Sequence, residues 1–169
     1  EKALEKDENH RQANNRLMDI LQQEYNRTEK REAYEKAVEY ANKQIEIIDD
    51  DFYRIERLLL FVDGYELDKA EEDARAAIEV NPENLYAHNG LGLCYMKRGK
   101  YSEAITHFLK AIDLTDKEDP ETTAPFTNCA RCYEALKEYD TAIDIMKKCT
   151  EIFNENLNLK YTIARIYTK

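Results

Sequence analysis

Helix-breaking residues are scarce in this chain of 169 residues, which has only 4 glycines and 3 prolines and no tryptophan. Because glycine and proline interrupt helices, their scarcity predicts long helices joined by short turns. The sequence also lacks any run of about 18 apolar residues, which excludes a membrane-spanning helix. Hydrophobic residues nevertheless make up 43% of the chain, enough to build a sizeable core.

Positive charge is in short supply as well, since 25 Lys and Arg face 35 Asp and Glu, giving a formal net charge of -10. A charge of this sign repels nucleic-acid phosphates and anionic lipids, so we predict no nucleic-acid partner and no membrane insertion. It does not oppose a basic or apolar peptide. The charged N-terminal residues show no signal peptide, and we expect a cytoplasmic protein.

Motifs for catalysis, nucleotide binding and metal binding are missing. There is no HExxH, no GxSxG and no glycine-rich phosphate loop, and the histidines His10, His88 and His107 are scattered. Cys129 and Cys132 have the spacing of half a metal site, but the second pair of ligands is absent. Both fall on the apolar face of a predicted helix, where cysteine is a small buried hydrophobe. We therefore predict no catalytic residue, no metal site, no cofactor and no enzymatic activity.

What is present is a repeated order of large and small residues. The clearest copy, at 84–114, reads x₂-L-G-x₂-Y and then A-x₃-F-x₂-A, and comprises Leu91, Gly92, Tyr95, Ala104, Phe108 and Ala111. The next copy has the same intervals in Cys129, Ala130, Tyr133, Ala142, Met146 and Cys149. Apolar residues three and four apart line one helix face, and small residues let two helices approach closely. Each copy thus predicts a helical hairpin, which must stack on its neighbours to bury its apolar face.

These intervals resemble the tetratricopeptide repeat family over nearly the whole chain. The resemblance implies an all-α fold, a right-handed α-α superhelix of stacked hairpins. In the repeat at 51–84, Arg57 stands where the family prefers leucine. From Leu21 to Ala37 is sixteen residues, against nine from Tyr95 to Ala104, so the earliest hairpin should be about one turn taller.

The repeat frame divides the chain into six parts. We predict the end of a preceding helix at 1–10, a lengthened hairpin at 11–50, repeats at 51–84, 85–122 with a longer linker and 123–156, and the first helix of a further or capping repeat at 157–169. Because both chain ends fall inside repeats, we expect the chain to be a piece of a longer array. The alternative is that its ends are incomplete capping helices, which solenoids also use.

In the family the first helix of each hairpin lines a concave groove, and the resemblance extends this to the matching positions here. The predicted groove residues are Phe52, Ile55, Leu59, Tyr86, Asn89, Leu93, Met96, Asn128, Arg131, Asn158, Tyr161 and Arg165. The apolar members would bind by burial. The asparagines suit a peptide backbone, and Arg131 and Arg165 suit a carboxylate.

The sequence therefore predicts a non-catalytic scaffold that binds a protein, as a peptide or helix, in this groove. One family subclass holds chaperone C-terminal tails with a Lys/Asn/Asn/Lys/Arg clamp. At the clamp positions counted from residue 85, this chain has Asn89, Leu93, Asn128, Asn158 and Thr162, so chaperone-tail binding is not expected. The alternative is a regulatory or accessory segment of a larger enzyme.

Overall fold

The computed structural model describes residues 20, 23, 31–48, 51–115, 120–153 and 163–166. Across these residues every regular element is a helix, which confirms the predicted all-α class. Within the same ranges no helix is long and apolar enough to cross a membrane. The chain divides into two compact units, residues 1–73 and 74–169, and each is described by itself.

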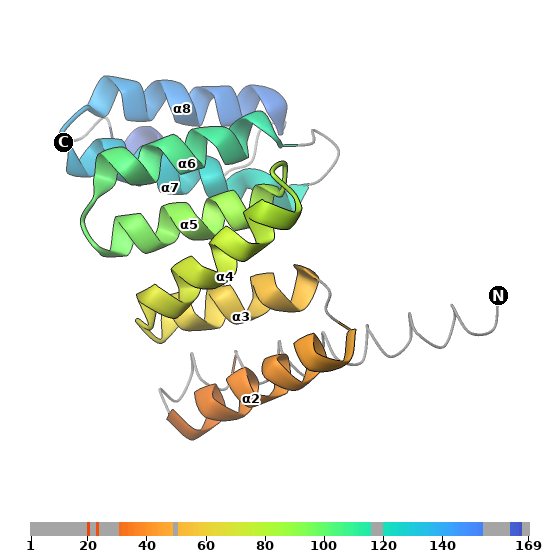
Figure 1. Cartoon of the computed structure of the whole chain (residues 1–169). Coiled ribbons are helices and arrows are strands. Elements are labelled where there is room, and N and C mark those ends of the chain that lie inside the picture. Colours follow the sequence, from red (N-terminus) through yellow and green to blue (C-terminus); the bar gives the residue numbers. More distant parts are fainter. Residues whose placement is uncertain are drawn as a thin grey trace. The chain divides into compact units, whose positions relative to one another are not determined.

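The first unit contains α2 (Arg31–Ile48), α3 (Asp51–Asp63) and the first part of α4 (Leu67–Val80). Helices α2 and α3 pack against each other (Figure 1). Both helices contribute to the core: the small residues Ala37 and Ala41 of α2 and the large residues Tyr53 and Leu58 of α3 are fully buried. With 18 residues, α2 is about one turn longer than α4, α6 or α8, which have 13 or 14.

The predicted first helix of the 11–50 hairpin lies outside the described residues, apart from residues 20 and 23. Residues 1–10 also lie outside them. The division of the chain into six parts therefore stays a prediction.

A largely buried ion pair joins α3 to the middle of α4 in the first unit. Arg57 Nε and Nη2 donate to the two carboxylate oxygens of Asp73 at 2.8 and 2.6 Å, and Nη1 donates to Asn42 Oδ1 at 2.7 Å. Only 6% of the Asp73 side chain and 20% of the Arg57 side chain are exposed. The hydrogen bonds to Asp73 raise the pKa of Arg57 above its ordinary value. Arg57 thus replaces an apolar residue by supplying polar contacts between three helices.

The second unit holds the rest of α4, then α5 (Leu85–Lys97), α6 (Tyr101–Asp113), the 3-10 turn η1 (Pro120–Thr123), α7 (Ala124–Ala135) and α8 (Tyr139–Ile152), with a helical stretch at 163–166. Each of the helices α5 to α8 packs on the next, and α5 also contacts α7 (Figure 1). Large buried side chains such as Phe108 and Met146 fill the core beside the small residues Ala104 and Ala142. The predicted alternation of large and small residues is therefore what builds this core.

Three helix–helix turns share one backbone geometry. Tyr65, Gly99 and Lys137 follow α3, α5 and α7 with positive φ angles of 59°, 74° and 65°. The next N–H in each case donates to the carbonyl five residues earlier, from Glu66 to Phe61, from Lys100 to Tyr95 and from Glu138 to Tyr133, at 2.8, 2.9 and 2.9 Å. This left-handed cap satisfies helix carbonyls and favours glycine, because a Cβ strains the backbone there.

We expect Lys137→Gly to raise the free energy of unfolding by about 0.5–1 kcal/mol, since it relieves that strain in an exposed turn. The reverse change, Gly99→Ala, should lower it by about 1 kcal/mol. A Cβ at Gly99 would meet nothing within 4 Å, so only the backbone angle is at stake. Urea unfolding of both variants checks the pair, and equal midpoints for Gly99→Ala and the parent would contradict it.

The cysteines are buried, as predicted. Cys94, Cys129, Cys132 and Cys149 have no exposed surface and form no disulfide. Burial raises the pKa of Cys129 and Cys149 to about 12 and that of Cys132 to about 11. The thiolate is the reactive form, so these groups are unreactive packing residues at neutral pH. Within the described ranges no group of three metal-binding side chains is poised around a common point.

Candidate functional site

The polar side of α7 presents the predicted binding residues of the second unit. Asn128, Arg131 and Glu134 are spaced three apart and therefore share one side of the helix. The other side is buried in the core through Phe126, Cys129, Ala130 and Cys132. Packing of the apolar side thus fixes which way the polar side faces.

An asparagine pair connects this side of α7 to α5. Asn128 Nδ2 donates to Asn89 Oδ1 at 3.4 Å, a long hydrogen bond between partly buried side chains. The structure therefore brings together two of the predicted binding residues from neighbouring predicted repeats. Each amide has more donors and acceptors than this one bond uses.

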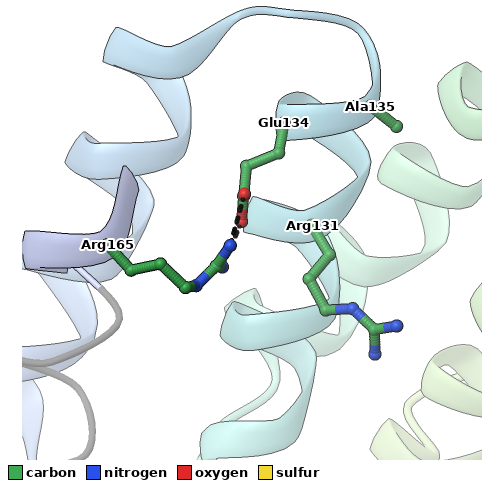
Figure 2. Close-up of a pocket in the computed structure, with 4 residues that line it drawn as sticks. All are labelled: Arg131, Glu134, Ala135 and Arg165. Atoms are coloured by element: carbon green, nitrogen blue, oxygen red, sulfur yellow. Dashed lines mark hydrogen bonds and ion pairs between the residues drawn. The ribbon is translucent and has the colours of Figure 1, made fainter. Parts of the chain in front are cut away.

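Arg165 already has a carboxylate partner within the chain. Its Nη1 and Nη2 atoms donate to the two carboxylate oxygens of Glu134 at 2.9 and 2.7 Å (Figure 2). The Glu134 side chain is only 7% exposed and that of Arg165 is 39% exposed. Two parallel charge-assisted bonds of this kind fix both side chains and hold residues 163–166 to α7.

Sequence reasoning placed Glu134 on the groove side of this helix but did not predict that it pairs with Arg165. It assigned Arg165 to a carboxylate of a partner, whereas the fork of that guanidinium is occupied by Glu134. A signal was available: Glu134 lies three residues after Arg131, on the same side of α7. An acid at that place faces the next first helix, from which Arg165 comes.

An open pocket of about 420 Å³ lies beside this ion pair, lined by Arg131, Glu134, Ala135 and Arg165. The guanidinium of Arg131 points away from Glu134 (Figure 2). Arg131 is exposed, and it forms no hydrogen bond or ion pair with the rest of the described chain. Among the described lining residues, the pocket therefore offers the donors of Arg131 to a ligand.

The apolar residues predicted for the groove are partly used for folding. In the first unit Ile55 is buried, at 7% exposure, while Phe52 and Leu59 are half-buried. In the second unit Leu93 and Met96 are half-buried against the core cluster. A charged substitution at Leu93 would consequently disturb the core as well as any partner contact.

Of the three remaining predicted groove residues, the structure describes one. Tyr86 is 48% exposed, so its ring is accessible on α5. Asn158 and Tyr161 lie outside the described residues. Phe52 and Tyr86 belong to different units, so the predicted groove that includes both stays a prediction.

Comparison with known families and proteins gives a consistent result. A tetratricopeptide repeat profile matches residues 83–155. The chain is 27% identical over 101 residues to anaphase-promoting complex subunit 3 of Schizosaccharomyces pombe, a match covering 60% of this chain and 15% of that protein. It is 31% identical over 87 residues to stress-induced-phosphoprotein 1 of Caenorhabditis elegans, covering 52% of this chain and 26% of that protein. The chain thus matches only a small part of either relative.

A solved structure shares the fold. The crystal structure of a thermophilic tetratricopeptide protein of Thermus thermophilus superposes with a TM-score of 0.75 at 18% sequence identity. The match covers 90% of this chain and 80% of that one. At this identity the likeness establishes a solenoid of helical hairpins, the predicted superhelical class.

Proposed function

Because this chain belongs to the tetratricopeptide repeat family, we propose that it is a non-catalytic scaffold that binds a protein partner. The partner binds as a peptide or a helix, across the first helix of each hairpin. Stacked repeats commonly use extended concave surfaces for binding. The observation that carries the proposal is the polar side of α7. There the asparagine pair, the Arg131 guanidinium and an open pocket occur together on the side away from the core.

Each part of this surface suits an extended chain. Asn89 and Asn128 can donate to and accept from a peptide backbone whatever its side chains are. Tyr86, exposed on α5, offers a large ring with a hydroxyl group at low entropic cost. A partner that lies across α5 and α7 would gain affinity from the ring and orientation from the amides.

The proposal excludes the chaperone-tail clamp of the family. Of the five clamp positions, three are asparagines in this chain and the other two are Leu93 and Thr162. None of the five is a cation that could hold a terminal carboxylate. Arg131 lies at a different position of the repeat, three residues after the clamp asparagine. The binding chemistry we propose therefore differs from that of the clamp.

We expect the double variant Asn89→Ala, Asn128→Ala to lose most partners that the parent protein captures from cell extract. Glu103→Ala, Lys110→Ala is the matched control, since it removes two exposed polar groups from α6 without changing the net charge. Both variants should keep the helical circular dichroism of the parent. Equal retention of the same partners by both variants would move binding to another face and contradict the proposal.

A further inference from the structure

The pocket beside α7 has a charge balance that selects its ligand. We propose that Arg131, with the Glu134–Arg165 pair behind it, binds one singly charged carboxylate, the side chain of an aspartate or glutamate in the partner. This inference rests on the proposed function and names the chemical group that the polar side of α7 recognises.

The charge of the pocket is the first argument. Its described lining residues supply two guanidinium groups and one carboxylate, which leave a net charge of one positive unit, because Glu134 is paired with Arg165 at 2.7 and 2.9 Å. A single carboxylate neutralises that charge. A phosphate carries about -1.5 to -2 charges at pH 7 and would leave an excess beside the carboxylate of Glu134. The pocket therefore favours a carboxylate over a phosphorylated side chain.

The geometry is the second argument. A guanidinium presents its donors in a planar fork that matches two carboxylate oxygens, and the fork of Arg131 is unused in the described chain. Glu134 is directed to Arg165 and not to Arg131 (Figure 2). The partly buried ion pair thus keeps Glu134, the acid among the described lining residues, from occupying Arg131. Arg131 is the binding residue, and Glu134 and Arg165 are positioning residues.

The place of Arg131 indicates that the ligand is a side chain and not a chain terminus. Helix α7 contacts α5 through Asn128 and Asn89 and contacts residues 163–166 through Glu134 and Arg165. Arg131 lies on the middle one of these three elements. A peptide that crosses all three passes Arg131 and continues, so it presents a side-chain carboxylate there.

Pools of synthetic nonapeptides test this directly. In three of the pools each peptide is acetylated and amidated, has a fixed central residue and has four randomised residues on either side. The central residue is aspartate, asparagine or phosphoserine, and a fourth pool ends in a free carboxylate after four randomised residues. We expect the immobilised protein to retain the aspartate pool about tenfold more than the asparagine pool, the equivalent of one charge-assisted bidentate contact. It should retain the phosphoserine and free-terminus pools less than the aspartate pool.

Arg131→Gln should abolish the preference for aspartate over asparagine, whereas Lys148→Gln, which removes the same charge from an exposed site on α8, should leave it unchanged. Glu134→Gln adds one positive unit to the pocket and should shift the preference toward phosphoserine. Retention of every pool without a preference for aspartate would overturn the inference while the proposed function stands. Failure to retain any pool would overturn both. If the protein retained the free-terminus pool more strongly than the aspartate pool, the ligand of Arg131 would be a terminal carboxylate and not a side chain.

Discussion

Replacing Asp73 by alanine is expected to lower the free energy of unfolding by about 3–5 kcal/mol, the largest effect we predict for a single substitution. The reason is the charge left behind. Only 20% of the Arg57 side chain is exposed in the first unit, and Asp73 neutralises its guanidinium through two hydrogen bonds. Without Asp73 the guanidinium keeps only Asn42 as a hydrogen-bond acceptor among the contacts described above.

A double variant distinguishes the effect of the unpaired Arg57 charge from the effect of changing the packing at position 73. Asp73→Ala combined with Arg57→Leu removes both charges and places at 57 the residue that the repeat family prefers. Replacement of a buried ion pair by apolar side chains is often neutral, so the double variant should recover most of the lost stability. Asp68→Ala, an exposed acid in the first turn of α4, should cost about 0.5 kcal/mol.

Urea unfolding followed by circular dichroism measures all three variants. If the double variant were as unstable as Asp73→Ala alone, the loss would come from the packing of residue 73 and not from the unpaired charge of Arg57. If Asp73→Ala behaved like Asp68→Ala, the ion pair would contribute nothing to stability.

The second large effect is expected at Gly92 in α5. A Cβ at this position would lie 2.6 Å from Cε1 and 2.7 Å from Cδ1 of Phe108, which is fully buried in α6. Alanine is the better helix former by about 1 kcal/mol, but the Phe108 ring is fully buried, and protein interiors are closely packed. We therefore expect Gly92→Ala to lower the free energy of unfolding by about 1–3 kcal/mol.

A double-mutant cycle identifies the cause. Phe108→Leu shortens the side chain opposite Gly92 and should destabilise the protein by itself, because it leaves a cavity. In the Phe108→Leu background, Gly92→Ala should be neutral or stabilising, since the overlap is gone and the helix propensity remains. Additive losses in the cycle would show that Gly92 does not act through its contact with Phe108.

Features that depend on residues close together in the sequence could be predicted from it. Ala104, Phe108 and Ala111 lie within two turns of one helix, so their spacing alone predicted which face is buried. Gly99 predicted its turn, because it stands at the end of an apolar pattern. Tyr65 and Lys137 adopt the same left-handed geometry without being glycine, and nothing in their side chains signals it.

The candidate site also has one feature that the sequence could predict and one that it could not. The side of α7 that carries Asn128 and Arg131 could be predicted, because the apolar residues between them mark the buried side. Which partner each of these side chains binds within the chain could not be predicted. Arg165 was expected to bind a partner's carboxylate and instead binds Glu134, 31 residues earlier in the chain.

By itself, the sequence determined the helical hairpins, their buried faces and the small residues at which helices meet, because these depend on intervals of three and four residues along one helix. Only the tertiary structure decided that Arg57 is neutralised by Asp73, that Glu134 holds Arg165 and that no residue of the described ranges occupies the Arg131 fork. An ion pair forms between atoms within about 4 Å of each other, and which side chains from different helices come that close is set by how the helices pack.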